Sequence, residues 1–237
     1  MPIPEPPSDD QVLIVITPLD VCGSGWQTYN AELPEDDKQR THQYHYDADR
    51  LRFAKCHCLL RRIIAAWKGI QPIQVTFRRG ENGKPFLCHS GGLQFNISHT
   101  HGSAIFAFCH ESEIGIDIEY IERDADFDGV ALKVFTPLEQ NMLRQLNGRE
   151  KRRGFFRLWT AKEAFMKATG RGFSLDPSSI ETSLPESPGQ AGTFNCNTID
   201  NSASLLVTEV PTPPGYHAML CAPSTVLSRP PSVTSMQ

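Results

Sequence analysis

The chain has 237 residues and a net charge of −4 at pH 7, and its 39% hydrophobic and 21% charged residues are typical of a soluble globular protein of one or two domains. This charge excludes a general nucleic-acid binder, because such domains are strongly basic. No apolar run approaches the roughly 20 residues that span a bilayer, and the start does not resemble a secretory signal. We therefore expect a cytoplasmic protein with no nucleic-acid or membrane partner.

In the first half of the chain, the pattern predicts one long helix among several strands. Residues 1–10 are proline-rich and acidic and predict a loose tail, whereas residues 12–17 form an apolar run typical of a buried strand. A helical period over residues 47–67 ends at Gly69, and its basic residues predict a solvated face: Arg50, Arg52, Lys55, Arg61 and Arg62. Further strands are expected at residues 73–78, 92–98, 103–110 and 113–120, with a turn at Asn82-Gly83 between the first two.

In the second half, helices come first and strands follow. Residues 130–145 predict a helix with a new start at Pro137, and residues 155–169 predict a helix that the following Gly-Arg-Gly ends. Strands are expected at residues 205–210 and 216–222, before a Pro/Ser/Thr-rich stretch, 222–237, that predicts a disordered tail. Strands mixed with helices and hairpin turns favour an α+β fold over a doubly wound parallel sheet.

The seven cysteines are scattered and form no Cys-x-x-Cys pair. Cys56-His57-Cys58 has the wrong spacing for a zinc site. Because nothing directs the chain to an oxidising compartment, we expect reduced thiols that are mostly buried.

Asp117 and Glu119 lie in the strand-like run Ile114-Gly-Ile-Asp-Ile-Glu119. Alternate residues of a strand share a face, so the two carboxylates point the same way, about 6.6 Å apart along the backbone, while the isoleucines point into a core. Neighbouring carboxylates repel each other unless a positive charge lies between them, and Mg²⁺ is one such charge. The alternative is a solvated acidic edge strand.

Glu163 and Lys167 lie one helical turn apart in Trp159-Thr-Ala-Lys-Glu-Ala-Phe-Met-Lys167, on the same face as Trp159. They are either an ordinary surface pair or a third carboxylate for a cation with a lysine for a phosphate. Together with Lys162 they suit phosphoryl chemistry, in which positioning and charge neutralisation supply most of the catalysis.

A third motif combines Asn82-Gly-Lys-Pro85 with Phe95-Asn-Ile-Ser-His99. We expect Phe95 and Ile97 to face a core and the polar residues between and after them to face outward. His99 lies where the strand ends, which is a usual place for a functional side chain, although a lone histidine is more often structural.

Four motifs follow one another along the chain: Gly-Lys-Pro, Phe-Asn-Ile-Ser-His, Gly-Ile-Asp-Ile-Glu and Trp-x-x-Lys-Glu-Ala-x-x-Lys. In this order they resemble the surfactin-type 4′-phosphopantetheinyl transferases, and the resemblance covers residues 32–174. The resemblance implies two similar α+β halves related by a pseudo-twofold axis, with the active site at their interface. We expect these halves at residues 10–111 and 112–221, between tails at residues 1–9 and 222–237. The implied reaction moves phosphopantetheine from coenzyme A to a serine of an acyl or peptidyl carrier protein and releases 3′,5′-ADP.

The resemblance also implies the roles of individual residues. Asp117, Glu119 and Glu163 would bind Mg²⁺, and Glu163, directly or through water, would activate the carrier serine while Lys167 holds a phosphate. The residues implied to bind coenzyme A are Lys38 and Arg50 near its 3′-phosphate, Lys84 and Pro85 beside the adenine, and Ser98, His99 and Lys167 near the ribose or phosphates. Glu139 is either a second acid/base candidate or a helix-start glutamate favoured by the helix dipole.

Two other functions stay open at this point. One is a non-catalytic protein of the same fold that binds coenzyme A or a carrier, and the other is a metal-dependent phosphohydrolase acting on coenzyme A. The expected partners are carrier domains of fatty-acid, polyketide or nonribosomal-peptide synthases, in a setting such as secondary metabolism. The basic helix face from Arg50 to Arg62 would steer an acidic carrier toward a monomeric enzyme.

Overall fold

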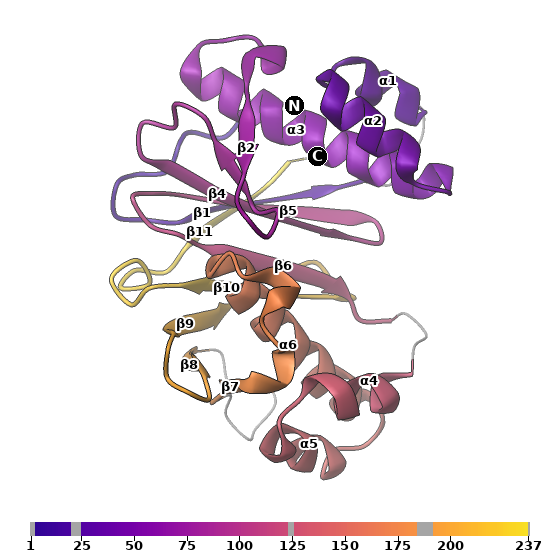
Figure 1. Ribbon diagram of the computed structural model, residues 1–237, viewed down its shortest axis with the longest axis vertical. Coiled ribbons are helices and arrows are strands. Elements are labelled where there is room, and N and C mark those ends of the chain that lie inside the picture. Colours follow the sequence, from indigo (N-terminus) through magenta and orange to yellow (C-terminus); the bar gives the residue numbers. More distant parts are fainter. Residues whose placement is uncertain (1–2, 20–24, 123–125, 184–191, 237) are drawn as a thin grey trace.

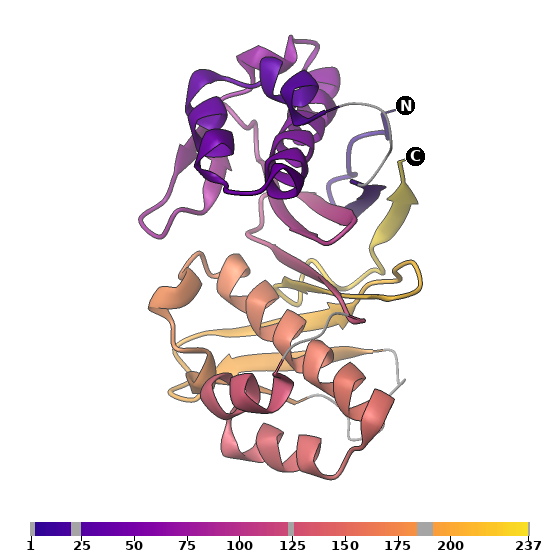
Figure 2. The same cartoon turned by 90° about the vertical axis from the view of Figure 1, so that its right-hand side faces the viewer.

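Apart from residues 1–2, 20–24, 123–125, 184–191 and 237, the computed structural model describes the whole chain. Two sheets pack face to face, and a long helix covers the outer face of each (Figure 1). In Figure 2 the strands of the first sheet lie below α1–α3, and α6 runs in front of the strands of the second sheet. This arrangement confirms the predicted α+β class.

The first sheet has the strand order β11-β1-β5-β4, with β11 parallel to β1 and the other pairs antiparallel. Its strands are β1 (Leu13–Pro18), β4 (Leu93–Thr100), β5 (Ser103–His110) and β11 (Ser232–Ser235). Helix α3 (Asp47–Lys68) covers this sheet and ends at Gly69, whose φ of 63° is the left-handed conformation that glycine adopts readily. Two shorter helices, α1 (Trp26–Ala31) and α2 (Glu35–Gln43), lie against α3.

The second sheet is antiparallel, with the order β6-β10-β9-β8-β7. Its strands are β6 (Gly115–Tyr120), β7 (Ile180–Thr182), β8 (Thr193–Thr198), β9 (Ser204–Glu209) and β10 (Tyr216–Ala222). Helix α6 (Gly148–Ala168) covers its outer face, and α4 (Phe127–Val134) and α5 (Pro137–Arg144) pack beside α6. A separate hairpin of β2 (Phe77–Arg79) and β3 (Pro85–Leu87) projects from the first sheet.

Three buried layers hold this arrangement together. Phe106 of β5 packs under α3, Ile105 lies between the sheets, and Phe165 of α6 packs on the second sheet. Because Ile116 and Ile118 also enter the layer between the sheets, the alternate residues of β6 must face α6. The predicted split between isoleucines and carboxylates along this strand is therefore confirmed.

Several expected elements differ from the structure. Residues 72–74 form a short 3₁₀ helix instead of the start of a strand, and α6 begins seven positions before the predicted residue 155. Helices α1 and α2 and strands β3, β7 and β8 were not expected. The helix restart at Pro137 is confirmed, with the Thr136 hydroxyl accepting a hydrogen bond from the Glu139 backbone N–H at the start of α5.

Both tails pack more closely than expected. Residues 232–235 are not disordered, because they form β11, and Met236 is 4% exposed in the layer under α3. At the other end, the Trp67 indole N–H donates to the Pro4 carbonyl at 2.6 Å, and Ile3 packs on the same layer. The two ends therefore lie on the same side of the molecule, beside the first sheet (Figure 2).

The predicted solvated face of α3 is wrong for two of its five basic residues. Lys55 is buried and donates to the carbonyls of Pro18 and Leu19, and Arg61 is buried against Asp37. The other three are paired with carboxylates: Arg50 with Asp47, Arg52 with Asp49, and Arg62 with Glu32. These pairs neutralise the positive charge that was expected to attract an acidic carrier.

Each of the six described cysteines is a free thiol, as predicted, and Cys22 lies outside the described residues. Across the described part of the chain, no helix combines the length and apolar character that crossing a bilayer requires.

Candidate active site

The two sheets meet along β4 and β6, which are the end strands of their sheets and lie side by side. We call this contact the seam. The Asn96 side-chain carbonyl accepts a hydrogen bond from the Ile116 backbone N–H at 3.0 Å, and the Ser98 hydroxyl donates to Asp117 Oδ1 at 2.7 Å. Asn96 and Ser98 therefore face the other sheet, with 5% and 7% exposure, and not solvent as expected.

A glycine brings α6 directly onto β6. A Cβ atom on Gly115 would lie 1.9 Å from the Ala164 carbonyl oxygen and 2.4 Å from the Ala168 nitrogen, so no other residue permits this approach. The close contact places the Lys167 ammonium 2.7 Å from Asp117 Oδ1 and 2.9 Å from the Ser98 hydroxyl. The positive charge that the sequence required next to the carboxylates is thus supplied, in this structure, by Lys167.

Asp117 has one oxygen occupied and one available. Its Oδ1 accepts hydrogen bonds from Ser98 and Lys167, whereas the buried Oδ2 has no hydrogen-bond partner among the described residues. An unsatisfied buried carboxylate oxygen costs free energy, because it has given up its hydration. Oδ2 is therefore an atom at which a cation would be stabilised.

Glu119 is held from two directions. The Thr100 hydroxyl donates to its Oε2 at 3.1 Å, and the Trp159 indole N–H donates to its Oε1 at 3.1 Å. Both contacts fix the orientation of the carboxylate beside Asp117 on the same face of β6.

Glu163 lies on α6, where burial, and then the nearby charge of Asp117, raise the pKa of its carboxyl to about 7. Lys167 opposes this rise, and Glu119 adds a smaller increase. A carboxyl with a pKa near neutrality is suited to proton transfer at physiological pH. The three carboxylates predicted to act together are therefore close enough to interact electrostatically.

The carboxylates of Asp117, Glu119 and Glu163 suit Mg²⁺ better than a metal ion that takes all of its ligands from the protein. Among the described residues, no three His, Cys, Asp or Glu side chains are close enough to hold a metal ion by themselves. Mg²⁺ commonly takes one or two carboxylates and completes its shell with water and substrate phosphate. The free Oδ2 of Asp117 and the neighbouring Glu119 provide such a partial set.

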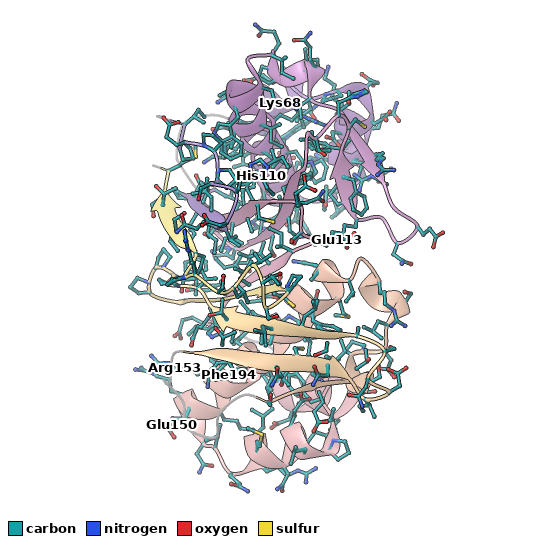
Figure 3. All side chains as sticks on the ribbon, turned by 90° about the vertical axis from the view of Figure 1, so that its left-hand side faces the viewer. Lys68, His110, Glu113, Glu150, Arg153 and Phe194 are labelled. Carbon is teal, nitrogen blue, oxygen red and sulfur yellow. The ribbon has the colours of Figure 1, made fainter. Side chains whose placement is uncertain are left out.

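A cavity of about 200 Å³ lies beside Lys167, with Lys84, Pro85 and Ile97 among its lining residues. The Lys84 ammonium donates to the Ala168 carbonyl at 2.9 Å, so the turn of the β2–β3 hairpin is fastened to the end of α6. Burial lowers the pKa of Lys84, against an opposing effect of Glu113. Figure 3 shows Glu113 near the middle of the molecule, where the two halves meet, whereas Glu150 and Arg153 lie in the lower half on the opposite side of the view.

His99 lies on the opposite face of β4 from Ser98. Burial, and then the charges of His57, Lys167 and Arg52, lower the pKa of His99 to about 4, so its imidazole is neutral at pH 7. A neutral imidazole can still donate a hydrogen bond to phosphate from one ring nitrogen.

The two residues expected near a 3′-phosphate, Lys38 and Arg50, make their contacts within the first half of the chain. Arg50 is bonded to Asp47 and to the Tyr44 carbonyl and lies 5.5 Å over the Trp26 ring, and Lys38 is half-buried on α2. Neither residue lines the cavity beside Lys167.

Glu139 and Lys162 are structural, so the helix-start interpretation of Glu139 is confirmed. Their charged atoms are 2.6 Å apart, and the side chains are 0% and 1% exposed. Glu139 also accepts hydrogen bonds from the Thr136 N–H and from Thr182, while Lys162 donates to three backbone carbonyls. The expectation that Lys162 takes part in phosphoryl chemistry is wrong, because its ammonium is enclosed between α5, α6 and β7.

Sequence reasoning missed Thr100 and Gly115. Thr100 continues the alternation of Asn96 and Ser98 along β4, which was a usable signal for a shared face. The partner of that face could not be read, because Glu119 belongs to a different sheet.

Comparisons with known proteins agree with this geometry. Residues 113–221 match the 4′-phosphopantetheinyl transferase superfamily, and residues 21–110 match the family described as 4′-phosphopantetheinyl transferase, N-terminal. The chain therefore belongs to the 4′-phosphopantetheinyl transferase superfamily.

Individual relatives cover most of the chain. The 4′-phosphopantetheinyl transferase HetI of Nostoc sp. is 36% identical over 179 residues, which are 73% of this chain and 76% of the relative. A putative 4′-phosphopantetheinyl transferase, slr0495, of Synechocystis sp. is 33% identical, over 62% of this chain and 60% of the relative. The 4′-phosphopantetheinyl transferase Sfp of Bacillus subtilis is 27% identical, over 79% of this chain and 80% of the relative.

Proposed function

We propose that this protein transfers 4′-phosphopantetheine from coenzyme A to a serine of an acyl or peptidyl carrier protein, releases 3′,5′-ADP, and depends on Mg²⁺. The observation that carries the proposal is the Lys167–Asp117 pair at the seam, beside a cavity and near enough to Glu163 and Glu119 for the charges to interact. Such a site supplies charge neutralisation and positioning, which are what phosphoryl transfer requires.

Asp117 and Glu119 would hold the cation, with Glu163 completing the acidic site. When bound, Mg²⁺ would neutralise charge on the pyrophosphate of coenzyme A. The Lys167 ammonium would hold a phosphate oxygen, since its present position between Ser98 and Asp117 already aims it at the seam.

In the reaction, the serine oxygen forms a bond to the β-phosphorus of coenzyme A. The bond from that phosphorus to 3′,5′-ADP breaks, and the leaving group keeps the electron pair. The serine proton passes to Glu163, directly or through water, since Glu163 is a carboxylate beside Asp117 and Lys167 that can accept a proton at the seam.

Coenzyme A would lie across the seam. Lys84 and Pro85 would flank the adenine at the 200 Å³ cavity, and Ser98 and His99 would contact the ribose or phosphates. Arg50 would reach the 3′-phosphate, helped by Lys38, by exchanging its contact with Asp47 for the substrate.

We further propose a surfactin-type enzyme that works as a cytoplasmic monomer, with halves at residues 10–111 and 112–221. The two matched regions, residues 21–110 and 113–221, support a division at this point. A similar placement of α3 and α6 on their sheets supports a pseudo-twofold relation between the halves.

The test is to incubate the protein with an apo-carrier, coenzyme A and Mg²⁺ and to measure the intact mass of the carrier. We expect a gain of one phosphopantetheine that stops when the cation is chelated. Coenzyme A binding without a mass gain on any of several carriers would favour a non-catalytic protein, and 3′,5′-ADP release without a carrier would favour a phosphohydrolase. A panel of carriers in the same assay identifies the client.

A further inference from the structure

We infer that Thr100 is a positioning residue, which fixes Glu119 for the cation and thereby makes cation binding depend on the seam. This inference rests on the proposed function. It assigns the residue no contact with substrate, because its hydroxyl acts through Glu119.

The hydroxyl of Thr100 has a defined direction. Its oxygen accepts a hydrogen bond from the Tyr120 backbone N–H at 3.3 Å and donates to Glu119 Oε2 at 3.1 Å. A hydroxyl has one proton to donate, so an accepted N–H leaves that proton directed at the carboxylate. Thr100 is thus bonded both to the backbone of β6 and to a side chain that this strand carries.

Thr100 and Trp159 donate hydrogen bonds to Glu119 from opposite sides of the seam. Thr100 belongs to β4 of the first sheet, whereas Trp159 belongs to α6, which covers the second sheet. These two contacts tie the carboxylate to both sheets, and a displacement of β4 along β6 would break the contact with Thr100.

Neighbouring positions of β4 show that this contact is specific. Asn96 accepts from the Ile116 backbone, and so joins the sheets without touching a carboxylate, whereas Ser98 contacts Asp117. The cation site is therefore aligned by the last two alternating positions of the strand, Ser98 for Asp117 and Thr100 for Glu119.

Residues that orient metal ligands are worth about 10- to 100-fold in metal affinity. We therefore expect Thr100→Val, which keeps the shape of the side chain but removes the hydroxyl, to weaken Mn²⁺ binding by about that factor. Thr100→Ser restores the hydroxyl and should bind Mn²⁺ within about threefold of the wild type.

The experiment titrates Mn²⁺ into the protein with coenzyme A and no carrier, by calorimetry. A matched control is Thr198→Val, because Thr198 is also a strand threonine with a hydrogen-bonded hydroxyl. Thr198 contacts Ser202 and Ala203 in a turn of the second sheet, and it is buried, whereas Thr100 is partly buried. Urea unfolding of each variant separates lost affinity from lost stability.

Weak Mn²⁺ binding by Thr100→Val, recovered in Thr100→Ser and unaffected in Thr198→Val, supports the inference. A transfer rate of Thr100→Val that recovers at higher Mg²⁺, but not at higher coenzyme A, supports it independently. Unchanged affinity in Thr100→Val, or an equal loss in Thr198→Val, overturns it. If the wild type transfers phosphopantetheine at full rate in a chelator, the Mg²⁺ part of the proposed function fails, and this inference fails with it.

Discussion

Two lysines on α6, five positions apart, form ion pairs of the same kind that differ in whether a ligand could still join them. Lys162 lies 2.6 Å from Glu139, with both side chains at most 1% exposed. Lys167 lies 2.7 Å from Asp117, with side chains that are 27% and 7% exposed. The distances are nearly equal, so distance does not distinguish the two pairs.

The difference lies in what else the charged atoms contact. Lys162 has three backbone carbonyls besides Glu139, and both oxygens of Glu139 accept hydrogen bonds from Thr136 and Thr182. Asp117 keeps a buried oxygen without such a partner. The Lys162–Glu139 pair has all of its hydrogen bonds within the protein and so has no atom left for a ligand. In the Lys167–Asp117 pair, by contrast, Asp117 could bind a cation and Lys167 a phosphate in place of each other.

The largest expected effect on stability comes from breaking the Lys162–Glu139 pair. Lys162→Met should destabilise the protein by about 3–5 kcal/mol, because it leaves the charge of Glu139 buried without its cation. Urea unfolding measures the change, with Lys167→Met as the matched control on the same helix. Equal losses in the two variants would show that the pairs do not differ as described.

Asp117→Ala removes the carboxylate of the Lys167–Asp117 pair. We expect transfer to fall by about 10²–10³-fold, as when one preorganised electrostatic contact to a transition state is lost. The fold should persist, because Lys167 is partly exposed and can regain hydration. Intact-mass kinetics and circular dichroism test the two parts, and activity retained at ordinary Mg²⁺ would remove Asp117 from the cation site.

A smaller effect concerns the pH dependence of stability in the chelated protein. The pKa of Glu163 is raised from 4.5 to about 7, so its contribution is complete below pH 4.5 and is lost as pH rises through 7. The pKa of His99 is lowered from 6.5 to about 4, so its contribution is complete above pH 6.5 and is lost as pH falls through 4.

Between pH 6.5 and 8, therefore, only the Glu163 contribution of these two changes. Relative to Glu163→Gln, the free energy of unfolding of the wild type should fall by roughly 1 kcal/mol between pH 6.5 and 8. Urea unfolding at several pH values in a chelator measures both proteins. The same slope in Glu163→Gln would contradict the raised pKa.

The smallest effect is expected on the exposed side of α3. Arg62 and Glu32 form a two-pronged pair, and both side chains are 38% exposed, so Arg62→Ala should cost less than about 1 kcal/mol. Because the pair already neutralises its own charge, the rate of carrier association should change little. A clear loss of association rate at low salt would restore the basic face as a docking surface.

The sequence was sufficient where local pattern and packing agree. The periods of α3 and α6 and the alternation of β6 were readable, since each has one consistently apolar face. Helix α2 was not, because its nine residues, EDDKQRTHQ, contain no apolar side chain. Strand β11 was missed because its composition is that of a tail, and only its pairing with β1 makes it a strand.

For the site, residue types could be predicted but their partners could not. Asp117, Glu119, Glu163 and Lys167 were found from their spacing within single elements. The contacts of Lys84 with Ala168 and of Thr100 with Glu119 depend on how the two sheets are placed, which spacing along the chain does not encode. Glu139 differs, because the sequence left its role open and the structure decides it through a capping box with Thr136 within one helix start.

The pairing of β11 with β1 joins Leu13 to Ser232 and so governs the order in which the molecule is completed during synthesis. The second sheet has all of its strands once residue 222 has left the ribosome, whereas the first sheet still awaits its last strand. Domains generally fold from the N-terminus onward as they emerge. Here the sheet that begins first is finished last, so a nascent chain stopped between residues 222 and 232 would contain one complete sheet and one with an open edge along β1.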